Sequence, residues 1–114
     1  MINFACKQFK LEEIIKCGLG LTKADCKVFM NLLNESDWVT TESIAKKLDL
    51  NLSTVQRAVK KLFTSEILDR TQENLDGGGY IFLYRHKPKK VIKKIIMSKV
   101  SDWTVLVSSA LDKW

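Results

Sequence analysis

The chain has a single histidine, His86, and a single proline, Pro88. One histidine leaves little material for a Ser/His/Asp triad, and no pair of carboxylates is recognisably placed for acid–base chemistry. The lack of further proline, and of any low-complexity stretch, excludes a Pro-rich linker. We therefore expect a protein that is not an enzyme and that holds no metal or other cofactor.

Cysteine is also sparse, with Cys6, Cys17 and Cys26 far apart and no CxxC pair among them. A structural zinc site needs ligands paired at close spacing, and His86 cannot complete this set. We expect reduced thiols that pack as small apolar groups. A redox role for one of them stays open.

Long apolar runs are absent, which excludes a membrane-spanning helix. The N-terminus also lacks the apolar core and small-residue cleavage site of a signal peptide, so we expect a cytoplasmic protein. A chain of 114 residues has room for one domain with a modest core.

Positive charge is the property that the chain has in excess, with a net charge of +6. From Gly77 to Ser101 there are seven basic residues and no acidic one. They are Arg85, Lys87, Lys89, Lys90, Lys93, Lys94 and Lys99. Such a concentration of charge suggests a polyanionic partner, although a solvated lysine face is the simpler alternative.

Amphipathic helices are predicted in the first third of the chain. The first covers about Phe4 to Cys17 and is broken by Gly18 and Gly20. A second begins at Thr22, because Asp25 three residues later completes a capping-box pattern. Its inward side is formed by Cys26, Phe29, Met30, Leu32 and Leu33.

Two short helices and a tight turn are predicted next. After a short extended segment at Trp38–Val39, a helix capped by Thr40 or Thr41 runs to Leu48, and Asn51 caps a second helix over about residues 52–65. The second helix has an apolar stripe at 3.6-residue spacing, formed by Val55, Ala58, Val59, Leu62 and Phe63. Its other side is polar and basic.

A hairpin is predicted over about residues 67–86. Its strands, Ile67–Thr71 and Tyr80–Tyr84, flank the glycine tip Gly77–Gly79. A phosphate-binding loop would need a helix with a Lys-Ser or Lys-Thr start after the glycines, and none follows.

A long helix from Pro88 to near Trp114 closes the chain. Its apolar residues repeat at alternating steps of four and three, which is the spacing of a helix–helix seam. The predicted dimer interface is Ile96, Val100, Trp103, Val107, Ala110 and Trp114. Packing of the two tryptophans within one chain is the alternative.

This order of elements predicts a mostly α fold with a small β-hairpin (α+β), a winged helix-turn-helix over residues 1–87 followed by a dimerisation helix over residues 88–114. Three segments, Leu19–Leu33, Ser43–Leu62 and Gly77–Arg85, resemble the archaeal TrmB-like transcriptional regulators and, more loosely, the MarR-type winged helices. The large sugar-binding domain of many TrmB-like proteins has no counterpart here, which leaves any effector open.

The resemblance implies a homodimer that binds double-stranded DNA, with the helix at 52–65 in the major groove and the wing on the backbone or minor groove. Its positions imply base contacts by Ser53, Thr54, Gln56 and Arg57. Arginine can grip guanine, and glutamine adenine, through paired hydrogen bonds. The implied backbone contacts are Thr41, Lys60, Lys61, Arg85, His86, Lys87 and Lys89.

Two further functions stay open at this stage. An architectural protein would bind DNA through phosphates alone and would show steep salt dependence without sequence preference. A winged helix can also serve as a protein-interaction module, but the exposed lysines speak against that use, since protein interfaces deplete lysine at their centres.

Overall fold

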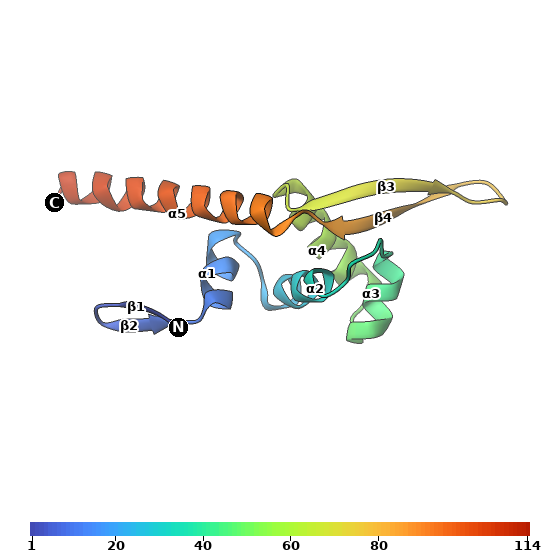
Figure 1. Cartoon of the computed structure of the whole chain (residues 1–114), viewed down its shortest axis with the longest axis horizontal. Coiled ribbons are helices and arrows are strands. Elements are labelled where there is room, and N and C mark those ends of the chain that lie inside the picture. The colour runs from blue at the N-terminus through green and yellow to red at the C-terminus, as the bar shows by residue number, and fades with distance from the viewer. The chain divides into compact units, whose positions relative to one another are not determined.

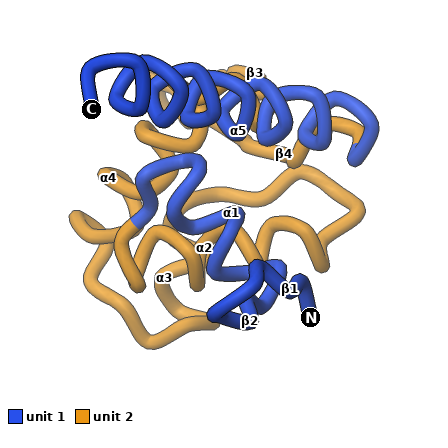
Figure 2. Tube along the Cα trace, turned by 90° about the vertical axis from the view of Figure 1, so that its left-hand side faces the viewer, with its two compact units in different colours: residues 1–21, 89–114 blue, residues 22–88 orange.

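A computed structural model describes the whole chain, residues 1–114, and it divides into two compact units (Figure 2). One unit is Thr22–Pro88, and the other combines Met1–Leu21 with Lys89–Trp114. The N-terminal helix and the C-terminal helix thus belong to the same unit. No helix has both the length and the apolar character needed to cross a membrane.

The unit Thr22–Pro88 has the predicted order of three helices followed by a hairpin (Figure 1). Its elements are α2 (Lys23–Leu33), α3 (Thr41–Leu48), α4 (Leu52–Thr64), β3 (Leu68–Asn74) and β4 (Tyr80–His86). This is a winged helix-turn-helix, so the predicted α+β fold class is confirmed.

The start of α2 is fixed by the predicted capping box. The backbone N–H of Asp25 donates to the Thr22 hydroxyl at 3.1 Å, and the Thr22 N–H donates to the Asp25 carboxylate at 2.9 Å. Two N–H groups that the helix itself cannot satisfy are thereby paired.

The turn between α3 and α4 sets the angle of the helix-turn-helix. Asp49 ends α3 in the left-handed conformation, with φ of 53°, and the N–H of Leu50 reaches back to the Ala45 carbonyl at 3.0 Å. Aspartate tolerates this conformation better than most residues do. Asn51 stands at the predicted N-cap of α4, although its side chain makes no capping hydrogen bond.

Side chains from all three helices and from β3 form the core of this unit. The fully buried ones are Val28, Phe29, Leu32, Ile44, Val55, Val59, Leu62, Ile67 and Leu68. Burial of each such side chain stabilises the fold by about 1.5–3 kcal/mol. Val28 was not in the predicted inward side of α2, whereas Cys26, Met30 and Leu33, which were, are only half-buried.

The wing has the predicted extent, but its two strands are longer than predicted, because pairing of β3 with β4 continues from Leu68 opposite His86 to Asn74 opposite Tyr80. The Val39 N–H donates to the Tyr84 carbonyl at 2.9 Å, and the Tyr84 N–H donates to the Val39 carbonyl at 2.8 Å. This pair confirms the short extended segment before α3. At the tip, Gly78 and Gly79 have φ of 95° and 80°, values that glycine adopts without strain.

The second unit begins differently from the prediction. Residues 4–9 are not helical: β1 (Ile2–Phe4) pairs with β2 (Lys7–Phe9), and α1 (Leu11–Gly18) follows. Glu13 accepts a hydrogen bond from the Lys10 N–H at 3.1 Å, and this bond places the helix start after the hairpin.

The last helix, α5 (Lys89–Asp112), has 24 residues and is therefore about 36 Å long. Pro88 lies just before it rather than in its first turn. Ile92 is buried and Val100 is half-buried, whereas every residue from Ser101 to Trp114 is exposed. The apolar residues of α5 are thus buried or half-buried in part of its first half and exposed from Ser101 onward.

Candidate nucleic-acid interface

The outer face of α4 carries the predicted base-reading residues. Ser53, Gln56 and Arg57 are exposed and Thr54 is half-buried, while Val55 on the opposite side is fully buried. The apolar stripe therefore fixes the rotation of the helix about its axis and turns these polar side chains outward. A helix held in this way has the dimensions that a major groove admits.

The two predicted backbone lysines of α4 have different surroundings. Lys60 is exposed, whereas the Lys61 ammonium lies 3.3 Å from the Asp25 carboxylate. Burial of Asp25 acts to raise its pKa, but hydrogen bonds from the Thr22 backbone and from Lys61 outweigh this effect, so its pKa lies below the usual value. Lys61 thus joins the end of α4 to the start of α2, a role that the sequence analysis missed.

A hollow of about 260 Å³ lies between the start of α3, the middle of α4 and the wing. It brings together two predicted contact residues, Thr41 and Gln56. The hollow is lined by Thr40, Thr41, Glu42, Gln56, Ile81, Phe82 and Tyr84. The recognition helix and the wing therefore share one concave surface.

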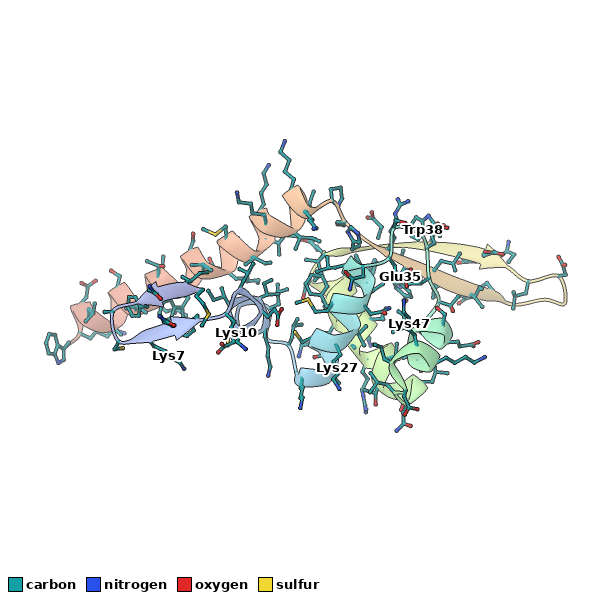
Figure 3. The ribbon with its side chains drawn as sticks, turned by 60° about the horizontal axis from the view of Figure 1, so that its bottom comes forward. Lys7, Lys10, Lys27, Glu35, Trp38 and Lys47 are labelled. Atoms are coloured by element: carbon teal, nitrogen blue, oxygen red, sulfur yellow. The ribbon has the colours of Figure 1, made fainter.

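The base of the wing holds the predicted backbone contacts Arg85, His86 and Lys87, all of which are half-buried. The Arg85 guanidinium lies 4.3 Å from the ring centroid of Trp38, which Figure 3 labels. The His86 Nδ1 donates to the Lys87 carbonyl at 2.7 Å, which leaves Nε2 available to a partner.

One charged residue of the wing was not predicted. Arg70, on β3, has its guanidinium carbon 4.3 Å from the ring centroid of Phe63 on α4 and 4.3 Å from that of Phe82 on β4. No sequence pattern brings these three residues together, because the contact with Phe82 depends on the strand register.

Most of the predicted dimer residues are exposed, and all of them belong to the other unit. Trp103 is 60% exposed and Trp114 fully so. Val107 and Ala110 are also exposed, while Ile96 and Val100 are half-buried. Lys89, a predicted backbone contact, is exposed at the start of α5.

Groups that could hold a metal ion are not present: no three His, Cys, Asp or Glu side chains come together. The three cysteines are free, with Cys6 and Cys17 exposed. On the surface near the helix-turn-helix, the Lys47 ammonium pairs with Glu35 at 2.7 Å (Figure 3). That exposed pair joins α3 to the segment after α2.

Comparison with known proteins identifies the family. Residues 9–105 match the model of the DnaD N-terminal domain, which is most of the chain. The chain belongs to the DnaD N-terminal domain family. The matched residues include the helix-turn-helix, the wing and most of α5.

Two similar proteins come from Methanosarcina mazei Go1 and Methanocaldococcus jannaschii. A structure described as a possible transcriptional regulator from Methanosarcina mazei Go1 is 50% identical, with a TM-score of 0.91, over 100% of this chain and 96% of that one. The uncharacterized protein MJ1503 of Methanocaldococcus jannaschii is 29% identical over 103 residues, which is 90% of this chain and 77% of the relative.

More distant structures share the fold. A MarR-family transcriptional regulator from Silicibacter pomeroyi has a TM-score of 0.51 at 14% identity over 90% of this chain and 77% of that one. A mutant of Staphylococcus aureus MepR, bound to an oligodeoxyribonucleotide, has a TM-score of 0.52 at 13% identity over 90% and 72%. The MarR-like fold is confirmed. The resemblance to TrmB-like proteins in particular stays a prediction.

Proposed function

We propose that this protein is a transcriptional regulator that binds double-stranded DNA sequence-specifically as a homodimer. The observation that carries the proposal is the outer face of α4, where exposed Arg57 stands opposite the buried Val55, Ala58, Val59 and Leu62, with exposed Gln56 on the flank. The similarity to a possible transcriptional regulator of M. mazei, and the DNA-bound state of MepR, support it. Such a protein would work in the cytoplasm.

In this proposal α4 enters the major groove and the wing lies along the backbone or minor groove. Ser53, Thr54, Gln56 and Arg57 read base edges, because their side chains are presented along one face near the helix start. The exposed Lys60, together with Thr41 and Lys89, meets phosphates. Arg85, His86 and Lys87 do so from the wing. Phosphate contacts fix the position of a protein on DNA, while base contacts set sequence preference.

Lys61 is the weakest member of this set, because its ammonium is already paired with Asp25. A phosphate contact would require that it leave a carboxylate that is largely buried. We therefore assign the phosphate contact near the end of α4 mainly to Lys60.

The dimer half of the proposal rests on α5. Every residue from Ser101 onward is exposed, and Trp103, Val107 and Trp114 expose 60%, 38% and 100% of their surface. Two such helices packed along the stripe of Ile96, Val100, Trp103, Val107, Ala110 and Trp114 would remove this apolar surface from water. Any small-molecule effector remains open.

An architectural role is the second candidate, favoured by the seven basic residues from Gly77 to Ser101. In that case affinity would come from counterion release alone and would be equal for all sequences. Both candidates bind DNA, and they differ in the part played by the outer face of α4.

The substitution Arg57→Ala separates them. We expect it to weaken binding to a preferred duplex by about 1–3 kcal/mol and to relax the choice of base at one position. The measurement is titration of wild type and variant against labelled duplexes that differ at single base pairs. Lys27→Ala, which removes an exposed charge from α2, is the matched control. An equal loss on every duplex would remove Arg57 from base reading.

A further inference from the structure

The guanidinium of Arg70 lies close to two aromatic rings. Its central carbon is 4.3 Å from the ring centroids of both Phe63 and Phe82. A cation is attracted to the face of an aromatic ring, so each contact favours this position of the guanidinium. Because Phe63 belongs to α4 and Phe82 to β4, Arg70 joins the recognition helix to the wing.

The two rings are themselves held in place. Phe82 meets Tyr80 edge to face at a centroid distance of 5.3 Å, and Phe63 meets Tyr84 at 6.5 Å. Tyr84 is buried and is the cross-strand partner of Arg70. The guanidinium is therefore restrained by rings that cannot easily turn away. A restrained planar group loses less rotational freedom on binding a ligand than a free side chain does.

None of the donors of Arg70 is used within the chain. The side chain is exposed, and it makes no hydrogen bond and no ion pair. The nearby acidic residues Asp69 and Glu73 lie on the other face of the strand. A guanidinium has five N–H donors arranged in its plane. Because none of these side-chain donors is bonded within the chain, they are free to grip two oxygens of one oxyanion.

The side of the wing that carries Arg70 also faces the recognition helix. Phe82, which contacts Arg70, lines the hollow together with Thr41 and Gln56. A duplex whose major groove receives α4 would pass along this hollow.

We propose that Arg70 binds a phosphate of the DNA backbone between the major-groove segment and the wing, as a planar fork held by Phe63 and Phe82. This inference rests on the proposed function. Arg70 was not among the DNA contacts predicted from the sequence, and the proposal makes it an oxyanion-binding site. Because a phosphate carries no sequence information, Arg70 affects affinity and position but not the choice of base.

The first test is the salt dependence of binding. Each phosphate contact contributes about 0.9 to the slope of log affinity against log salt, so Arg70→Gln should lower the slope by about one. Over a fourfold rise in salt, the variant then loses about 3.5-fold less affinity than wild type does. Lys27→Gln, which removes the same charge from α2, should leave the slope unchanged. An unchanged slope for Arg70→Gln would overturn the inference while DNA binding by the protein stands.

The second test distinguishes phosphate binding by Arg70 from a purely structural contact of Arg70 between the wing and α4. Arg70→Lys retains the charge but loses the planar guanidinium, and Phe82→Leu retains the arginine but removes one ring. Each variant should lose the same factor in affinity for a preferred duplex as for an unrelated one. In nitrogen-15 NMR spectra, the Nε–H signal of Arg70, assigned by its loss in Arg70→Lys, should move when duplex is added. If the Nε–H signal does not move when the protein binds duplex, Arg70 has only a structural role and the inference is wrong.

Inorganic phosphate serves as the comparison ligand in the same spectra. Movement at micromolar duplex, and none at equal concentrations of inorganic phosphate, supports a backbone contact. Equal response to both would indicate a site for free phosphate and would contradict the assignment to DNA. If wild type binds no duplex at any salt concentration, the proposed function fails, and the inference fails with it.

Discussion

Asp25 shows how one side chain can join local and long-range structure. Its carboxylate accepts from the Thr22 N–H at the start of α2 and from Lys61 near the end of α4. The first contact spans three residues and the second spans 36. The pairing of Thr22 with Asp25 could be predicted because both partners occur in a short sequence pattern. The contact with Lys61 could not, since it depends on how α2 and α4 pack.

A pH-dependent contribution to stability follows from the lowered pKa of Asp25. A group whose pKa is lower in the folded state stabilises the fold at pH values above its unfolded pKa, about 3.9, and this contribution is lost as the pH falls through the folded pKa. Asp25→Asn should therefore reduce the free energy of unfolding by about 1 kcal/mol at neutral pH. The difference from wild type should shrink toward zero as the pH falls below about 4.

Urea denaturation of both proteins across this pH range is the measurement. Asp76→Asn, at the exposed tip of the wing, is the control and should change stability little at any pH. If the Asp25→Asn difference did not shrink at all as the pH fell below about 4, ionisation of the Asp25 carboxylate would not be its cause.

Arg70 marks the limit of prediction at the residue scale. The exposed residues of α4 could be named in advance because helical spacing alone separates them from the buried stripe. Arg70 meets Phe63 and Phe82 only after β3 and β4 pair and the wing folds back on α4. Periodicity contains no information about either event.

At the scale of elements, the proposed dimer interface lies along α5. We expect Val100→Glu combined with Val107→Glu to convert a dimer to a monomer, because two carboxylates in an apolar seam would be buried without partners. The mass measured by sedimentation at micromolar protein should fall by about half, the change that loss of a two-fold interface requires.

The matched control places two carboxylates on the opposite side of the same helix. Ser101→Glu with Val105→Glu adds the same charge at residues that are exposed and lie outside the seam. The mass should then remain that of a dimer. Equal effects of the two double variants would mean that the stripe is not the interface.

The N-terminal hairpin was the element that the sequence did not reveal. Phe9, Leu11, Ile14 and Ile15 have spacings that suit a helix, and that pattern was extended back to Phe4. In the structure Ile2 pairs with Phe9 and Phe4 pairs with Lys7, so one face of the hairpin is mostly apolar. Strands of three residues are too short for their alternation to stand out against a helical pattern.

For the molecule as a whole, the order of elements was sufficient to predict a winged helix-turn-helix. Caps, turn residues and apolar stripes each agreed with that fold in the segment from Thr22 to His86. The grouping of the chain into two units was harder, because Met1–Leu21 and Lys89–Trp114 are separated by the whole winged helix. Contacts between distant segments leave no local pattern in a single sequence.

The measurement that tests the central claim most directly is selection of bound duplexes from a randomised DNA pool near physiological salt, followed by sequencing. The account predicts enrichment of a two-fold-related motif whose half-sites lie about one helical turn apart, because a dimer presents two copies of α4 to successive major grooves. Binding without enrichment would contradict sequence-specific recognition and would favour the architectural role. Absence of binding would contradict the DNA-binding function itself and would favour a protein-interaction module.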